Sequence, residues 1–162
     1  MEERQIHFIR RENPLIEHGL YLVLIGLLIA ATVTDLKYRL IYDRFVVIGI
    51  VAAVLARLFE RPEPWWNYVL TGFVVFLILY VIAVVTDERS IGGGDVKLFG
   101  MLGLALGFQP FLLIFFSSHL LAALYLLIVK LVRWNQVGRK TEFPFAPFIL
   151  LGTVFTYVLT KL

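Results

Sequence analysis

The chain is organised around the stretch Ser90-Ile91-Gly92-Gly93-Gly94-Asp95-Val96-Lys97-Leu98-Phe99-Gly100, in which a glycine-rich turn meets an apolar run. Asp95 directly follows three glycines, and residues 98–129 after it carry no formal charge. A charged carboxylate in the hydrocarbon layer of a membrane costs about 2.5 kcal/mol or more, so such an acid is a candidate functional residue. Glycines reach backbone angles that other residues avoid and leave room for a second chain. The alternative is a helix start, in which Asp95 caps the first free amides.

The composition is that of an integral membrane protein. Of the 162 residues, 60% are hydrophobic and 17% are charged, whereas a soluble domain has about 45–50% apolar and about 25% charged residues. There is no cysteine, which excludes disulfides and thiol catalysis. The three histidines, His7, His18 and His119, are isolated and lack metal-ligand spacing. We therefore expect no metal and no other cofactor.

Six apolar segments predict an all-α bundle of about six transmembrane helices. We expect them at residues 20–34, 45–59, 65–86, 95–106, 111–132 and 143–160. A spanning helix needs about 20 apolar residues, and residues 65–86 meet this most clearly. A helix over 95–106 would be only about 18 Å long, against a hydrocarbon core of about 30 Å. It must start inside the layer, lie where the bilayer thins, or pack behind longer neighbours.

The domain organisation is expected to be simple. Residues 1–19 have mixed charge and are expected to form an interfacial tail, and residues 20–162 one transmembrane domain. The start of the chain lacks the pattern of a cleaved signal peptide.

A second acid, Asp35, closes the first apolar segment. Two crossings separate it from Asp95, so both acids belong to the same face of the membrane. By our count that face holds nine basic residues and the other face six, which favours a cytoplasmic location for the acids and accounts for the net charge of +3 without nucleic acid. The nine are Lys37, Arg39, Arg44, Arg89, Lys97, Lys130, Arg133, Arg139 and Lys140, and the six are Arg4, Arg10, Arg11, Arg57, Arg61 and Lys161.

Two aspartates at helix ends, without a thiol or a serine–histidine pair, suggest aspartic peptide hydrolysis. Two carboxylates in one site hold one proton between them because their charges repel. The ionised member can take a proton from water while the protonated member polarises a carbonyl. Either Asp35 or Asp95 could be the initial base.

Three segments resemble the type IV prepilin peptidases, in the order that this family has them. Gly92–Leu98, followed by Leu102–Gly107, is similar to the family's GxGD region. Thr34–Ile41 is similar to its first aspartate segment, and Pro144–Phe148 to its late Pro-Phe element. One departure concerns Tyr42-Asp43, where the family has proline followed by Asn or Asp, and this puts the geometry of that turn in doubt.

The resemblance implies a function and a site. Asp35 and Asp95 would be the catalytic pair of an aspartic endopeptidase. The substrate would be a prepilin-like precursor, cut after a short basic leader and before a hydrophobic helix, beside the lipid bilayer. Larger members of this family carry an insertion with cysteine pairs that methylates the new amino terminus. This chain has no cysteine, so the resemblance implies the peptidase-only form that lacks N-methyltransferase activity. Substrate binding or loop positioning is expected of Gly92, Gly93, Gly94, Lys97, Asp43, Pro144, Phe145 and Pro147.

Other interpretations remain open. The two aspartates could form the relay of a proton-coupled transporter, or the chain could be a non-catalytic subunit of a pilus or secretion assembly. Asp43 could simply be solvated, and Lys97 lies two positions from Asp95, which on a helix points it elsewhere. Ser117, Ser118 and His119 are expected to form hydrogen bonds between helices. The oligomeric state is left open.

Overall fold

The computed structural model describes residues 14–87, 91–132 and 143–161. Within these ranges the chain forms six helices and no strand, which confirms the predicted all-α bundle. The helices are α1 (Pro14–Tyr38), α2 (Asp43–Phe59), α3 (Trp65–Val85), α4 (Gly93–Leu106), α5 (Phe108–Val132) and α6 (Ala146–Lys161). Most of the expected interfacial tail lies outside the described residues.

Three of the described helices, α1, α3 and α5, are long and apolar enough to cross a membrane. The others have 17, 14 and 16 residues, so the expectation of six helices holds but not all of them are full-length spans. Within the described residues α1 extends from Pro14, so it includes residues before the expected start at position 20. α6 begins at Ala146, later than expected, so Pro144 precedes the helix and Pro147 lies in its first turn.

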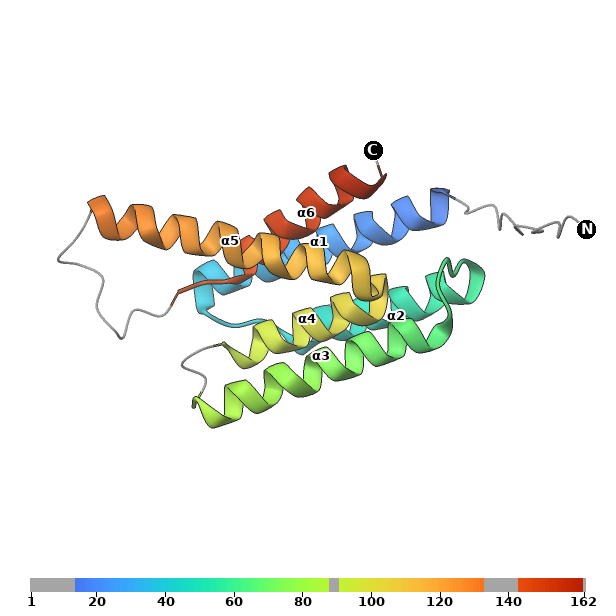
Figure 1. Cartoon of the computed structure of the whole chain (residues 1–162), viewed down its shortest axis with the longest axis horizontal. Helices are drawn as coiled ribbons and strands as arrows, with labels where there is room; N and C mark the ends of the chain where they lie inside the picture. Colours follow the sequence, from blue (N-terminus) through green and yellow to red (C-terminus); the bar gives the residue numbers. More distant parts are fainter. Residues whose placement is uncertain (1–13, 88–90, 133–142, 162) are drawn as a thin grey trace, which may run out of the picture.

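The helices run back and forth along the long axis of the molecule (Figure 1). The ends of α1 and α3 and the starts of α2, α4 and α6 lie together, and we call this the Asp95 end. The opposite end, where α2 and α4 finish, is called the Arg57 end. α4 packs against α2, α3 and α5, and nine of its 14 residues are buried. The short helix is therefore one that packs behind longer neighbours.

Two glycines fit α4 into this position. At Gly72 in α3, a Cβ atom would lie 2.6 Å from the Cβ of Leu104, so only glycine lets α3 and α4 come this close. Gly107 follows α4 with a φ of 80°, a conformation that favours glycine, and its N–H donates to the carbonyl of Gly103 at 3.0 Å. The chain can then turn at once into α5.

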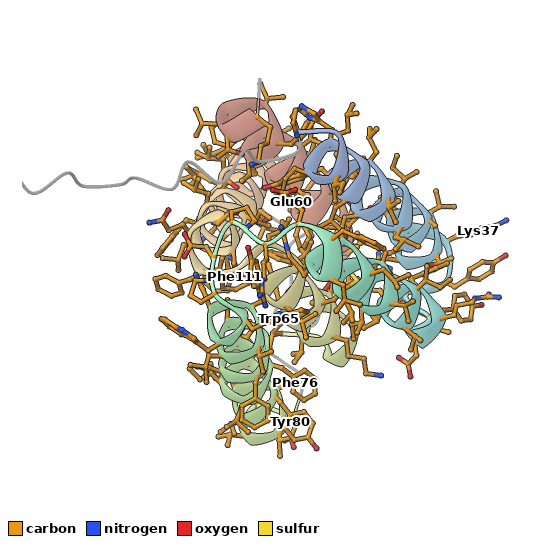
Figure 2. All side chains as sticks on the ribbon, turned by 90° about the vertical axis from the view of Figure 1, so that its right-hand side faces the viewer. Lys37, Glu60, Trp65, Phe76, Tyr80 and Phe111 are labelled. Carbon is orange, nitrogen blue, oxygen red and sulfur yellow. The ribbon has the colours of Figure 1, made fainter. Side chains whose placement is uncertain are left out.

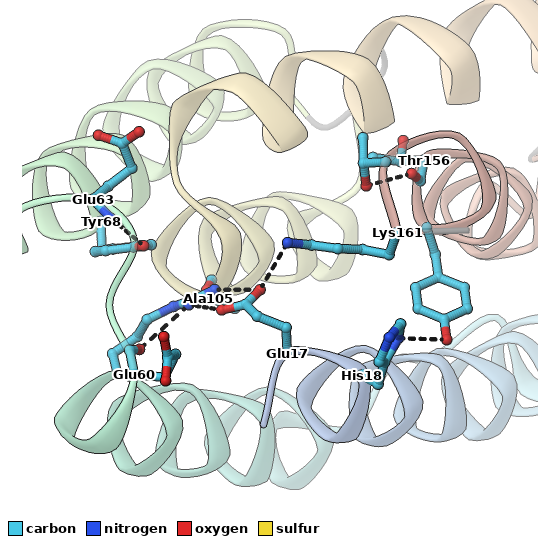
Figure 3. A network of polar contacts seen from close by, with 11 residues as sticks. Glu17, His18, Glu60, Glu63, Tyr68, Ala105, Thr156 and Lys161 are labelled. Carbon is cyan, nitrogen blue, oxygen red and sulfur yellow. Dashed lines mark hydrogen bonds and ion pairs between the residues drawn. The ribbon is translucent and has the colours of Figure 1, made fainter. Parts of the chain in front are cut away.

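A buried ionic cluster holds the Arg57 end together (Figure 3). Arg57 of α2 is only 2% exposed and pairs with Glu17 of α1. Its Nε donates to the carbonyl of Ala105 in α4 at 2.9 Å, and its guanidinium lies 4.6 Å from the ring centre of Tyr68 in α3. Lys161 of α6 places its Nζ 3.7 Å from Glu17 Oε2. Arg57 was counted among the basic residues of the opposite face, but its charge is buried and paired within the bundle and adds little to that face.

Candidate active site

Asp35 lies in the last turn of α1, where it is buried and 8% exposed. Its Oδ2 accepts a hydrogen bond of 3.2 Å from the backbone N–H of Ala146, the first residue of α6. The first amides of a helix have no partner within the helix, and the positive end of the helix dipole favours an anion there. Asp35 thereby links the end of α1 to the start of α6.

The hydrogen bonds of the Pro-Phe element leave the backbone N–H of Ala146 available to Asp35. The carbonyl of Phe145 accepts from the N–H groups of Phe148 at 2.9 Å and Ile149 at 3.3 Å. Pro147 has no N–H to satisfy. Asp35 accepts the amide of Ala146 and also faces the backbone of Phe145.

The hydrogen bond from the backbone of Ala146 to Asp35 was not predicted from the sequence. Backbone donors leave no mark in a sequence, and the prolines on both sides were the only signal. Of the predicted residues in this region, Pro144, Phe145 and Pro147 are absent from the cavity lining described below. Backbone groups of Phe145 and Ala146 face Asp35 instead, which fits positioning of Asp35 better than direct binding of a substrate.

Asp95 lies in the first turn of α4, but it does not cap the helix. Gly92 occupies the N-cap position, so the interpretation of Asp95 as the N-cap residue is wrong, although its carboxylate faces back toward the backbone of Gly92. Its Oδ1 is buried and has no hydrogen-bond partner among the described residues. A buried polar atom left in this state costs about 1–3 kcal/mol, so it calls for an explanation beyond folding.

The two aspartates line one open cavity of about 950 Å³ at the Asp95 end, and their charges repel each other. The walls come from the end of α1, the connection to α2, the second half of α3 and the start of α4. As Figure 2 shows, Phe76 and Tyr80 project from α3 on the side that faces α2. The cavity brings together these predicted residues: Asp35, Asp43, Gly92, Gly93, Gly94, Asp95 and Lys97.

The glycines serve close packing here. None of Gly92, Gly93 and Gly94 has a positive φ, so the expectation of unusual backbone angles is wrong. A Cβ at Gly94 would lie 2.9 Å from the Cβ of Ile41, in the connection between α1 and α2. The start of α4 can therefore approach the segment that follows Asp35 only because residue 94 has no side chain.

Lys97 and Asp43 form an ion pair at the rim of the cavity. Lys97 Nζ lies 2.6 Å from Asp43 Oδ1, and the side chains are 43% and 69% exposed. Asp43 is thus paired, and Lys97 lines the same cavity as Asp95 despite their spacing. The contact ties the start of α2 to α4. Tyr42 departs from the family pattern, yet α2 begins directly after it.

Polar residues elsewhere have local roles. Ser117 and Ser118 donate to the carbonyls of Leu113 and Ile114, both at 2.6 Å and within α5. The expected bonds between helices are therefore wrong for these serines, because a serine hydroxyl reaches the carbonyl four residues earlier. His119 contacts the carbonyl of Phe115 at 2.7 Å. In the described part of the chain, no three His, Cys, Asp or Glu side chains gather to hold a metal ion.

Comparisons with known proteins identify the family of this chain. A model of the type IV leader peptidase family matches residues 22–127. A prepilin leader peptidase/N-methyltransferase of Bacillus subtilis is 35% identical over 136 residues, which cover 84% of this chain and 54% of that protein. A protein with the same name from Pseudomonas putida is 28% identical over 129 residues, covering 77% of this chain and 44% of that protein.

The chain spans about half the length of these curated relatives. No solved structure matches it significantly. The family match covers the part of the chain that carries both aspartates, and the helices make it a multi-pass membrane protein. The chain belongs to the type IV leader peptidase family.

Proposed function

We propose that this protein is an aspartic endopeptidase that removes the basic leader from prepilin-like precursors at the membrane boundary. The observation that carries the proposal is the placement of Asp35 and Asp95 in the wall of one cavity, although 60 positions separate them in the chain. The names of the relatives supply the substrate class.

The two acids would divide the chemistry between them. Asp35 accepts an N–H from Ala146, and a hydrogen bond of this kind favours the ionised form of a carboxylate. The carboxylate of Asp95 also faces the backbone of Gly92, but its Oδ1 is buried and has no hydrogen-bond partner among the described residues. We therefore assign Asp35 as the base and Asp95 as the acid that holds the shared proton.

The reaction would proceed in two balanced steps. Asp35 takes a proton from a water molecule, whose oxygen attacks the carbonyl carbon of the bond to be cut, while Asp95 gives its proton to the carbonyl oxygen. A tetrahedral intermediate forms. In the second step the carbon–nitrogen bond breaks, the proton on Asp35 passes to the leaving amine, and Asp95 recovers its proton as the carbonyl reforms.

The orientation follows from charge. By the count from the sequence, the face that carries the aspartates has nine basic residues and the other face six, and the burial of Arg57 lowers the surface charge of the other face further. We therefore place the site at the cytoplasmic face of the inner membrane. The 162 residues contain no cysteine, so we assign peptidase activity alone and no N-methyltransferase activity to this chain.

Purified protein and a synthetic precursor test the proposal. The precursor would have a lysine-rich leader that ends in glycine, followed by an apolar helix, and mass spectrometry would identify the products. We expect one cut after the glycine and no effect of a metal chelator on the rate, since carboxylates activate the water. Persistence of the intact precursor would overturn the proposal, and proton uptake by liposomes that contain the protein would favour a transporter instead.

A further inference from the structure

An apolar groove continues from the cavity along α4. It has a volume of about 220 Å³ and lies between α2 and α3, with α4 as its floor. Phe76 and Lys97 line both the groove and the larger cavity, so the two adjoin each other at these residues. The groove is lined by Val46, Ile50, Gly72, Phe73, Phe76, Lys97, Gly100 and Met101.

The groove has the shape of a trough with apolar walls. Lys97, Gly100 and Met101 are spaced three and four positions apart and therefore share one face of α4. Gly100 lets the α3 wall pack closely against α4, since a Cβ there would lie 3.1 Å from the Cβ of Phe76. On the α3 wall, Phe73 is 62% and Phe76 is 38% exposed. Beyond Lys97 no charged side chain lines it.

We propose that this groove docks the apolar helix of the precursor, directly after the bond that is cut; this rests on the proposed function. The cavity holds the two acids and the charged rim, whereas the groove offers an apolar path away from them. Helix association in a bilayer depends on close packing, since lipid is as apolar as the helices. A trough walled by α2 and α3 supplies such a packing surface.

The direction of the helices gives the docking a register. α4 runs from the Asp95 end toward the Arg57 end, and Gly100 lies five residues after Asp95. At 1.5 Å per residue, Gly100 lies about 7.5 Å farther along the axis of α4 than Asp95, toward the Arg57 end. A substrate helix that enters from the same end runs parallel to α4, so about its fifth residue after the cut bond should face Gly100 and Ile50.

Cysteine cross-linking tests this docking, because the chain has no cysteine of its own. Ile50→Cys and Phe73→Cys place a thiol in the groove. Their chain neighbours Val51 and Val74 are 52% and 44% exposed and do not line the groove, so Val51→Cys and Val74→Cys are matched controls. The background is Asp95→Asn, and the probe is the synthetic precursor with a single cysteine at successive positions of its apolar helix.

We expect disulfide yields roughly ten times higher at the two groove positions than at the controls, as expected when two thiols are held close together. The yield should peak for a probe cysteine about five residues after the junction. Equal disulfide yields at all four positions, or no disulfide at any of them, would overturn the docking proposal. The groove would then be a lipid-facing surface. Cleavage by the unmodified chain is scored separately, so a failure of the proposed function is recognised without this test.

Discussion

The two ends of the bundle treat buried carboxylates in opposite ways. At the Arg57 end, Glu17 is paired with Arg57 and lies near Lys161, so its charge is balanced within the bundle (Figure 3). At the Asp95 end, two carboxylates face one cavity and repel each other, and Asp95 keeps a buried oxygen without a hydrogen-bond partner in the described chain. Acids at the first end serve stability, while those at the second carry a cost that points to chemistry.

The sharpest test of this contrast replaces each aspartate by asparagine. Asp35→Asn and Asp95→Asn should each lower the cleavage rate by about 10²–10⁴-fold or more, since in the proposed mechanism each removes a group that transfers a proton. Neither should lower the thermal stability, because the like-charge repulsion is also removed. Cleavage of the synthetic precursor and thermal unfolding in detergent measure the two effects.

Asp43→Asn is the matched control for this test, since Asp43 lines the same cavity at its exposed rim. It should retain most of the activity. An active Asp35→Asn or Asp95→Asn protein would contradict the assignment of the pair.

At the Arg57 end the opposite pattern is expected. Arg57→Met leaves Glu17 buried without its main partner and removes the donor to Ala105, and the loss of one partner of a buried pair costs about 3–5 kcal/mol. The melting temperature should fall strongly. A chain that carries both Glu17→Met and Arg57→Met should recover much of this loss, because apolar side chains can replace a buried pair.

The readout of this cycle is thermal unfolding of the single and double variants. If Arg57→Met melts like the unmodified chain, the cluster does not hold this end together, and the contrast between the ends fails. If the double variant is no better than Arg57→Met, the bond to Ala105 matters more than the charge.

Gly94→Ala probes the contact that brings the two acid-bearing segments together. The new Cβ would overlap Ile41, and overpacking of this kind costs about 1–3 kcal/mol. The start of α4 should shift, and cleavage should fall further than stability does. Ile41→Ala in the same chain should restore part of the activity, because it clears the space.

Gly26→Ala is the control, since no atom lies within 4 Å of a Cβ at Gly26. It should leave both activity and melting temperature near those of the unmodified chain. Equal losses for Gly94→Ala and Gly26→Ala would show that the close approach to Ile41 is unimportant.

The sequence predicted the Asp95 end better than the Arg57 end. Counting crossings was sufficient to place Asp35 and Asp95 at one end, because apolar segments and charged turns alternate clearly. Arg57 was expected inside the helix over residues 45–59 and was counted with the basic residues of the opposite face, but its buried ion pair was not predicted. Its partner Glu17 is 40 positions away, and no local pattern links them.

The hydrogen bond that positions Asp35 could not be predicted from the sequence either. Its partner is the backbone of Ala146, 111 positions away, and a backbone amide has the same identity at every residue but proline. The Pro-Phe element pointed to this region but not to the contact. The burial of α4 followed from its shortness only as one of three options, since length does not determine which neighbours a helix packs against.

The smallest effect is expected at the rim of the cavity, where the contrast between the ends is weakest. Lys97 and Asp43 form an ion pair like that of Arg57, but both side chains are well exposed, and exposed pairs contribute about 0–1 kcal/mol. Asp43→Ala should therefore change the melting temperature little and raise the KM for a basic leader modestly, in a salt-dependent way. Lys97→Asp combined with Asp43→Lys should restore the KM if the pair acts as a unit. A large loss of stability in Asp43→Ala would mean that the ion pair between Lys97 and Asp43 also holds α2 against α4. Charge pairing would then stabilise both ends of the bundle.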